Sequence, residues 1–273
     1  MKVRLMIDPS FRDLLERNSL ADYQALLRFG GGQLFKRNRY RSVVRIELEG
    51  RALFLKRHYK IPLGDFLRRL LKFQRPLSPG RAEWESALAL KELKIPTFHP
   101  VAWGERSILG IPIDSIFISS EISGAERLEK FITKRFPPPL DREGVKLKRG
   151  LTHRLAQITR VMHGAGLNHQ DFYLGHVFIN EGQLFIIDLQ RVEKRREVGL
   201  RRRIKDLAAL NFTAPQGIVS RTDRMRFLLD YLGLLRLRAR DKILIKNIER
   251  KTGRIRRHTE RLLARRTRAR SWS

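Results

Sequence analysis

The amino-acid sequence predicts an α+β fold of two lobes, with a small β-rich N-terminal lobe at residues 1–122 and a larger helical C-terminal lobe at residues 123–273. A chain of 273 residues is long enough for both lobes without spare sequence. Strand-like runs gather between residues 40 and 121. Helical patterns dominate the later part of the chain, at 150–164, 201–210 and 224–231.

The N-terminal lobe contains a predicted hairpin. Residues 43–48 and 52–56 read as strands, and residues 49–51 supply a tight turn around Gly50. Lys56 stands at the end of the second strand, where a kinase places the lysine that binds the ATP phosphates. The alternative is a lysine at the solvated end of an ordinary strand.

A helix follows the hairpin. Pro79 and Gly80 introduce a helical pattern that ends before Pro96. Its Glu83 is the candidate for the helix glutamate that pairs with Lys56, and Glu85 on the same helix is the alternative.

Two further strands are predicted at 101–105 and 115–121. The second of these is predicted to be the strand that leads into the hinge between the lobes. In a kinase, backbone groups of this hinge bind the adenine of ATP. Glu121 at its end is therefore a candidate nucleotide contact.

The segment 167–176 reads Leu-Asn-His-Gln-Asp-Phe-Tyr-Leu-Gly-His and indicates a catalytic loop. The protein-kinase loop reads His-Arg-Asp, four residues, then Asn, and His169, Gln170, Asp171 and His176 fall on those positions. Asp188 follows an apolar run at the separation that a kinase uses for its Mg²⁺ ligand. Asp171 is thus the predicted catalytic base and Asp188 the predicted metal ligand.

The two histidines of this loop have different expected roles. Imidazole is a poorer Mg²⁺ ligand than an amide oxygen, so His176 is expected to contact phosphate or to hydrogen-bond the loop. His169 is expected to be structural and to anchor the loop to the backbone near Asp188.

The phosphate-covering loop departs from the kinase pattern. A Gly-x-Gly-x-x-Gly motif is missing, and the glycines at 30–32 lie too early in the sequence to form a loop that covers the phosphates. The basic side chains of residues 35–41 can supplement backbone amides in holding the triphosphate. A basic hairpin tip in water fits the same residues equally well.

The formal net charge of +30 calls for a polyanionic partner such as nucleic acid, an anionic bilayer or a phosphorylated glycolipid. Basic residues become more frequent after Arg236, although such a run is often only the solvent-exposed face of a helix. The absence of cysteine excludes disulfides and thiolate metal sites. Charged residues interrupt residues 1–30, so we expect no signal peptide and a cytoplasmic protein whose membrane contact is peripheral.

An ordered series of stretches resembles the lipopolysaccharide kinase family, the Kdo and heptose kinases, and is most similar to its heptose I kinase branch. The stretches are 49–58, 82–85, 101–105, 162–171, 187–191, 205–210 and 224–228. The resemblance implies a protein-kinase-like fold that uses ATP and Mg²⁺ to phosphorylate a sugar of the lipopolysaccharide inner core. Lys56, Glu83, Asp171 and Asp188 inherit the family's ATP-lysine, helix-glutamate, base and metal roles. Gln170 stands where the family often has arginine.

The resemblance also gives the basic charge a partner. The expected acceptor is lipopolysaccharide, lipid A with its core, in the anionic inner leaflet of the cytoplasmic membrane. Residues 243–270 are expected to lie along that surface. No specific nucleic acid and no protein partner are predicted. The alternatives are a Kdo kinase, a small-molecule or protein kinase of the same fold, and a catalytically inactive, basic nucleic-acid-binding scaffold.

Overall fold

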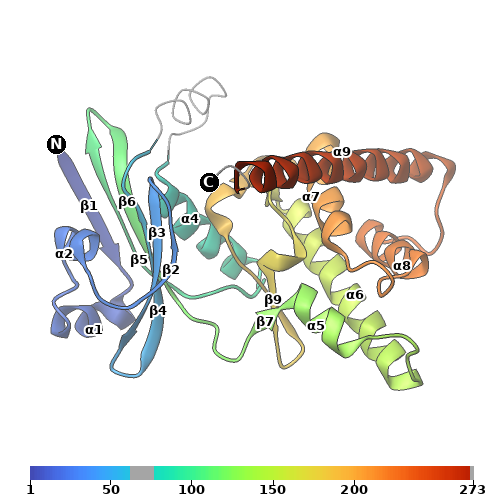
Figure 1. The fold of residues 1–273 in the computed structure, drawn as a ribbon, viewed down its shortest axis with the longest axis horizontal. Helices are drawn as coiled ribbons and strands as arrows, with labels where there is room; N and C mark the ends of the chain where they lie inside the picture. Colours follow the sequence, from blue (N-terminus) through green and yellow to red (C-terminus); the bar gives the residue numbers. More distant parts are fainter. Residues whose placement is uncertain (62–76, 271–273) are drawn as a thin grey trace. The chain divides into compact units, whose positions relative to one another are not determined.

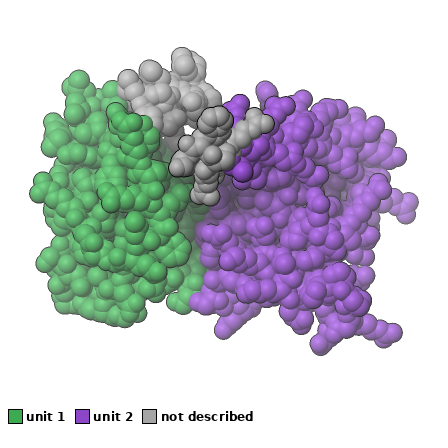
Figure 2. Space-filling model, viewed as in Figure 1, with its two compact units in different colours: residues 1–123, 188–192 green, residues 124–187, 193–273 purple. Residues whose placement is uncertain are grey.

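The computed structural model describes residues 1–61 and 77–270, which form two compact units (Figures 1 and 2). Unit 1 comprises Met1–Ser123 together with Asp188–Val192. Unit 2 comprises Gly124–Ile187 and Glu193–Ser273. The segment that begins at Asp188 therefore belongs with the N-terminal unit, although its neighbours in the sequence belong with the other one.

Unit 1 is built on a six-stranded antiparallel sheet in the order β1-β5-β6-β4-β3-β2. The strands are β1 (Lys2–Ile7), β2 (Gln33–Arg37), β3 (Arg41–Leu48), β4 (Arg51–His58), β5 (Pro100–Ile108) and β6 (Ile111–Ser120). The predicted hairpin is confirmed as β3 and β4. Glu49 and Gly50 form its turn with φ angles of 48° and 77°, the left-handed backbone that a tight hairpin requires.

The two faces of this sheet are covered by different helices (Figure 1). Short helices η1 (Pro9–Phe11), α1 (Arg12–Arg17) and α2 (Tyr23–Arg28) contribute Leu15 and Leu26 to a core that includes Leu53 and Leu55 of β4. Because side chains alternate along a strand, Lys56 points to the opposite face. Helix α4 (Pro79–Glu92) packs on that side, against β4, β5 and β6.

The start of α4 explains how closely it approaches the sheet. The Ser78 side chain caps the helix by accepting the N–H of Arg81, and Pro79 occupies the first turn. A Cβ atom at Gly80 would lie only 2.3 Å from the carbonyl oxygen of Ile116 in β6. Only glycine therefore allows this contact, which holds the first turn of α4 against the strand.

Unit 2 is mainly helical, with α5 (Leu128–Arg135), α6 (Arg142–Gly164), α7 (Leu200–Thr213), α8 (Arg221–Leu232) and α9 (Ala239–Arg270). Its short strands form two small sheets, β10 (Gln183–Ile186), β9 (Val177–Asn180) and β7 (Glu126–Arg127) in one and β11 (Glu193–Lys194) with β8 (Leu167–Asn168) in the other. The predicted helices at 201–210 and 224–231 are confirmed as α7 and α8. Helix α6 begins earlier than predicted because the Asp141 side chain caps it, accepting the Gly144 N–H at 2.7 Å.

Helix α9 lies alongside α7 (Figure 1), and Ile248 joins the core that includes Leu207 and Tyr231. From Arg256 onward the described side chains are exposed except for Thr259, which is half-buried, and the exposed set includes Leu262 and Leu263. Among the described residues, no helix has the length and apolar character that crossing a bilayer requires.

Candidate active site

The first part of the site is an ion pair in unit 1. Lys56 on β4 bonds to Glu83 on α4, whose side chain is completely buried. The Lys56 Nζ atom lies 5.5 Å from the ring centre of Phe98 and 5.7 Å from that of Phe117, so two aromatic rings flank the ammonium group. Glu85 instead pairs with Arg81 at 2.8 Å on the outside of the helix. The geometry therefore makes Glu83 the partner of Lys56.

Burial raises the pKa of Glu83, and the charge of Asp188 raises it further, while Lys56 acts in the opposite direction. Asp188 belongs to the same unit and immediately precedes the short helix η3 (Leu189–Arg191). Its φ of 58° is left-handed, a conformation that non-glycine residues avoid unless the surroundings enforce it. Such a residue next to the Lys56–Glu83 pair fits a functional role.

The end of β4 adds a second buried ionisable group, His58. Burial lowers its pKa to about 3, and the charges of Arg41 and Lys56 act in the same direction. The ring is therefore neutral at physiological pH. Arg41 also donates from Nη1 to the Gln190 side-chain oxygen at 3.2 Å, which ties β3 to the segment that follows Asp188.

Glu121 lies directly after β6, also in unit 1. Its backbone N–H donates to the Ala52 carbonyl at 2.9 Å, and its carboxylate accepts Arg45 Nη2 at 2.8 Å. The backbone N–H and the carboxylate oxygen Oε2 of Glu121 thus already have protein partners.

The second part of the site is the catalytic loop of unit 2, which one buried carboxylate organises. Asp206 on α7 accepts the backbone N–H groups of His169 and Gln170, each at 2.8 Å, and the Asn168 side-chain amide at 2.9 Å. Its fourth partner is the ring of His163, at 3.2 Å. Burial alone would raise the pKa of Asp206, but these hydrogen bonds bring it below the usual value.

No role was predicted for Asp206 from the sequence. The available signal was an aspartate within the apolar part of a helix, between Ile204 and Leu210, where a charged side chain is buried only if it has partners. Those partners lie about 40 positions earlier in the chain. Local pattern alone could not reveal them.

The contacts of the two loop histidines fit the roles expected for them. His169 Nε2 bonds to the Ile187 carbonyl at 3.0 Å, which confirms the predicted anchor beside Asp188. His176 Nδ1 lies 2.8 Å from the backbone carbonyl of Asp171, so this nitrogen carries the proton and His176 closes the loop around Asp171. Gln170 has a φ of 69°, a second left-handed non-glycine residue at a predicted functional position.

The predicted residues thus fall into two sets. Lys56, Glu83, Glu121 and Asp188 belong to unit 1, and Asp171 and His176 belong to unit 2. Unit 1 holds a lysine, its glutamate and an aspartate, the set that binds the phosphates and metal of a nucleotide in kinases. Unit 2 holds an aspartate on a loop that hydrogen bonds to Asp206 and from His176 hold in place, which suits a base that acts on an acceptor hydroxyl.

Comparisons with known proteins agree with this chemistry. The family model described as the lipopolysaccharide kinase (Kdo/WaaP) family matches residues 31–231. The chain is 32% identical over 241 residues to the lipopolysaccharide core heptose(I) kinase WaaP of Pseudomonas aeruginosa, which covers 84% of this chain and 86% of that protein. It is 30% identical over 208 residues to WaaP of Escherichia coli, at 73% and 77% coverage.

A solved structure, described as WaaP in complex with acyl carrier protein, is similar over 92% of this chain and 98% of that chain. Its TM-score is 0.71 and its sequence identity is 29%. This similarity confirms the predicted α+β, kinase-like fold.

Proposed function

The chain belongs to the lipopolysaccharide kinase (Kdo/WaaP) family, and we propose that it transfers the γ-phosphoryl group of ATP to heptose I of the lipopolysaccharide inner core. The resemblance to this family seen in the sequence is thereby confirmed. The observation that supports the proposal most is the buried Lys56–Glu83 pair in the unit that also holds Asp188. Curated relatives that carry the heptose(I) kinase name favour heptose over Kdo as the acceptor.

In the proposed mechanism the protein positions two substrates and balances charge. Lys56, held by Glu83 and two aromatic rings, binds the phosphates of ATP. Asp171 accepts the proton of the sugar hydroxyl as that oxygen attacks the γ-phosphorus, and ADP leaves. Asp206 keeps the Asp171 loop in position through two backbone N–H groups, so it acts as a positioning residue.

The donor set fits Mg²⁺. Mg²⁺ takes hard oxygen ligands and needs only one or two carboxylates beside the phosphates and water. Asp188 supplies such a carboxylate. A bound Mg²⁺ would neutralise charge on the phosphates. His176 Nδ1 is already committed to the Asp171 carbonyl, so we do not propose this nitrogen as a second ligand.

The proposed function is tested on lipopolysaccharide from cells with and without this protein. We expect the core from cells that lack it to be lighter by one phosphate, and fragmentation to place the missing group on heptose I. The purified protein with ATP should restore the group to the isolated core. Phosphate on Kdo would assign the other branch of the family, and unchanged core with no transfer in vitro would contradict the proposal.

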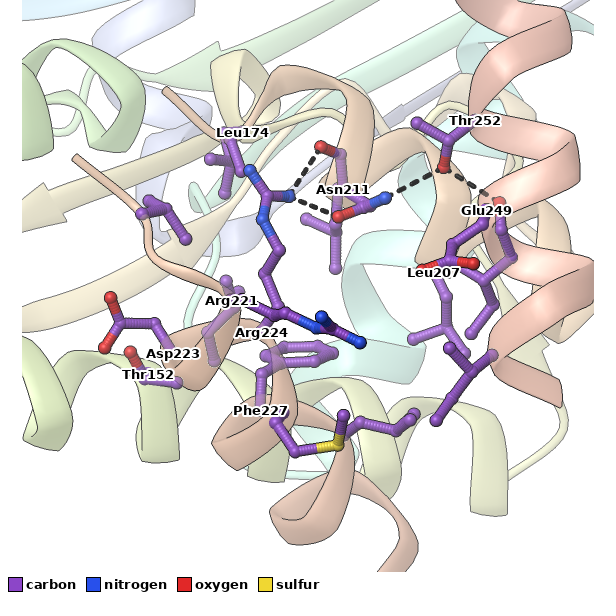
Figure 3. A pocket seen from close by; sticks show the side chains of 18 of the residues that line it. Thr152, Leu174, Leu207, Asn211, Arg221, Asp223, Arg224, Phe227, Glu249 and Thr252 are labelled. Atoms are coloured by element: carbon purple, nitrogen blue, oxygen red, sulfur yellow. Dashed lines mark hydrogen bonds between the residues drawn. The ribbon is translucent and has the colours of Figure 1, made fainter. Parts of the chain in front are cut away.

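We also propose an acyl carrier protein as a partner, although no protein partner was predicted from the sequence. A cavity of about 620 Å³ lies within unit 2, between α5, α6, α7, α8 and α9 (Figure 3). Its walls are mainly apolar, with Leu151, Leu155, Leu207 and Leu228 among them. That volume is within the range of ligand pockets. Because an acyl carrier protein carries an acyl chain and these walls are apolar, we propose an acyl chain as the occupant.

Polar groups at the cavity are paired with one another. Arg224 donates to the backbone and side-chain oxygens of Asn211, and Asn211 donates to Thr252 at 3.0 Å (Figure 3). Exposed basic residues also line the cavity and mark its solvent side, where a phosphate-bearing carrier arm would enter. They are Arg221, Lys242, Lys246 and Arg256.

Hexadecanoyl-acyl carrier protein should raise the melting temperature of the purified protein, because a ligand that binds only the folded state stabilises it. At 100 times Kd the gain is about 2.7 kcal/mol, or roughly 5–10 °C for a chain of this size. Leu210→Phe, which fills part of the cavity, should reduce the shift, while the exposed Leu88→Phe should not. An equal shift from carrier protein without an acyl chain would contradict this assignment of the cavity.

Finally, we propose that the protein acts in the cytoplasm and that the exposed end of α9 contacts the anionic membrane surface. Arg257, Arg261 and Arg265 are exposed and follow one another at helical spacing, with exposed Leu262 and Leu263 on another side of the helix. Exposed basic residues together with exposed apolar ones are typical of a helix that lies in the membrane interface. The first half of α9 instead packs on α7 and lines the cavity, so only the distal half is available.

Replacing these three arginines with glutamine should weaken binding to vesicles that contain 30% phosphatidylserine by about 100-fold, because each basic residue near the surface contributes roughly 1 kcal/mol. ATP binding should not change. The matched control replaces three exposed basic residues elsewhere, Lys91, Lys130 and Arg149, with glutamine. Equal losses in both triple variants would show that only the overall charge matters.

A further inference from the structure

In the turn between β2 and β3, three backbone N–H groups donate hydrogen bonds to acceptors within the same turn. The Asn38 side-chain oxygen accepts the N–H groups of Tyr40 and Arg41, at 2.9 and 2.8 Å. The Asn38 N–H donates to the Arg41 carbonyl at 2.8 Å. In protein kinases a glycine-rich loop covers the phosphates of ATP. These three amides already have acceptors inside the turn and are not available to a phosphate, so side chains are the other source of donors at this end of the sheet.

The strand register places Arg41 beside Lys56. In the β3–β4 pair, Arg41 lies opposite His58 and Val43 lies opposite Lys56. Residues that are opposite each other, and residues two apart along a strand, share a face of the sheet. Arg41, His58 and Lys56 therefore share the face on which Glu83 is buried.

The charge of Arg41 acts on the groups of the nucleotide site. It counters the effect of burial on the pKa of Glu83, and it adds to the effect of burial on His58. The two cations, Arg41 and Lys56, thus both act on the neutral His58 ring. The bond from Arg41 Nη1 to Gln190 fixes one edge of the guanidinium against the segment that starts at Asp188.

Buried polar atoms around Lys56 lack hydrogen-bond partners within the described part of the chain. They are Arg41 Nε, His58 Nε2 and Glu83 Oε2. Native proteins satisfy nearly all buried donors and acceptors, so a group of unsatisfied atoms marks a place for a ligand. A guanidinium group offers a planar pair of N–H donors that matches phosphate oxygens.

Resting on the proposed kinase function, we propose that Arg41 is a second phosphate-binding residue, which binds the nucleotide phosphates beside Lys56 in place of the backbone amides of a glycine-rich loop. Arg41→Ala should raise the Kd for Mg²⁺–ATP by about 10–100-fold, the range for losing a hydrogen bond to a charged group. The Kd for adenosine, which has no phosphate, should not change. Isothermal titration calorimetry on the purified full chain measures both.

Three companion variants separate a direct phosphate contact by Arg41 from a general effect of charge and from an effect through Gln190. Arg41→Lys keeps the charge but loses the planar pair of donors, so its Kd should fall between those of the wild type and Arg41→Ala. Arg39→Ala removes an exposed cation from the same turn and should have little effect. Gln190→Ala removes the neighbour that Arg41 holds and should not reproduce the loss.

An unchanged Kd for Mg²⁺–ATP in folded Arg41→Ala, or in Arg41→Lys if the alanine variant does not fold, would overturn the role of Arg41. The same holds if Arg39→Ala or Gln190→Ala has an equal effect, since Arg41 would then act by general charge or only through Gln190. These outcomes leave the proposed function intact as long as the wild type transfers phosphate. A wild type that binds no ATP would overturn both.

Discussion

Replacing Asp171 with asparagine should lower kcat for phosphoryl transfer to the lipopolysaccharide core by about 10²–10⁴-fold, the contribution of a positioned general base. The KM for ATP should not change, because Asp171 is proposed to act on the acceptor hydroxyl. The loop itself should keep its structure, since Asp206 and His176 hold it through backbone atoms. Steady-state kinetics with isolated core oligosaccharide measures both constants.

The matched control for this variant is Asp13→Asn, which makes the same chemical change at an exposed position of α1. It should retain the wild-type kcat. If Asp171→Asn lost affinity for ATP and kept kcat at saturation, Asp171 would be a nucleotide contact and the assignment of the base would be wrong.

Asp188→Asn should have an effect of similar size for a different reason. Losing the metal's charge stabilisation of ~4 kcal/mol, within the several kcal/mol that a metal ion supplies, lowers the rate by about 10³-fold. Unlike Asp171→Asn, this variant should also need more Mg²⁺ for half-maximal activity, because a neutral amide binds the ion less well. Measuring activity as a function of Mg²⁺ concentration at saturating ATP distinguishes Asp188→Asn from Asp171→Asn.

An Asp188→Asn protein with the Mg²⁺ dependence of the wild type would rule out Asp188 as the metal ligand. The structure supports the assignment by the position of Asp188 in unit 1 and its left-handed backbone, with φ of 58°. It also places the Asp188 charge close enough to Glu83 to raise the pKa of that glutamate.

Local sequence patterns predicted the elements whose signals are contained in a few neighbouring residues. The β3–β4 hairpin has alternating apolar residues and a glycine turn, and α4 has proline in its first turn. Those two elements carry Lys56 and Glu83. The choice between Glu83 and Glu85 needed the structure, because it depends on which side of α4 faces the sheet.

Features that depend on residues far apart in the chain could not be predicted in this way. Asp206 gains its role from loop residues that α7 meets only in the folded unit, and the cavity exists because five helices pack around it. The position of Arg41 follows from strand register, which pattern alone left open. Strand β1, which pairs with β5 from the very start of the chain, was also missed.

We propose that Lys56, Asp188 and Asp171 act on the same triphosphate. The most direct test is a crystal structure of the protein with Mg²⁺ and a non-hydrolysable ATP analogue. We predict a Mg²⁺ ion at about 2.0–2.1 Å from an Asp188 oxygen, Lys56 bonded to the phosphates, and the Asp171 carboxylate facing the γ-phosphate. A nucleotide bound elsewhere, or bound in this way with Asp171 remote from the γ-phosphate, would contradict the account.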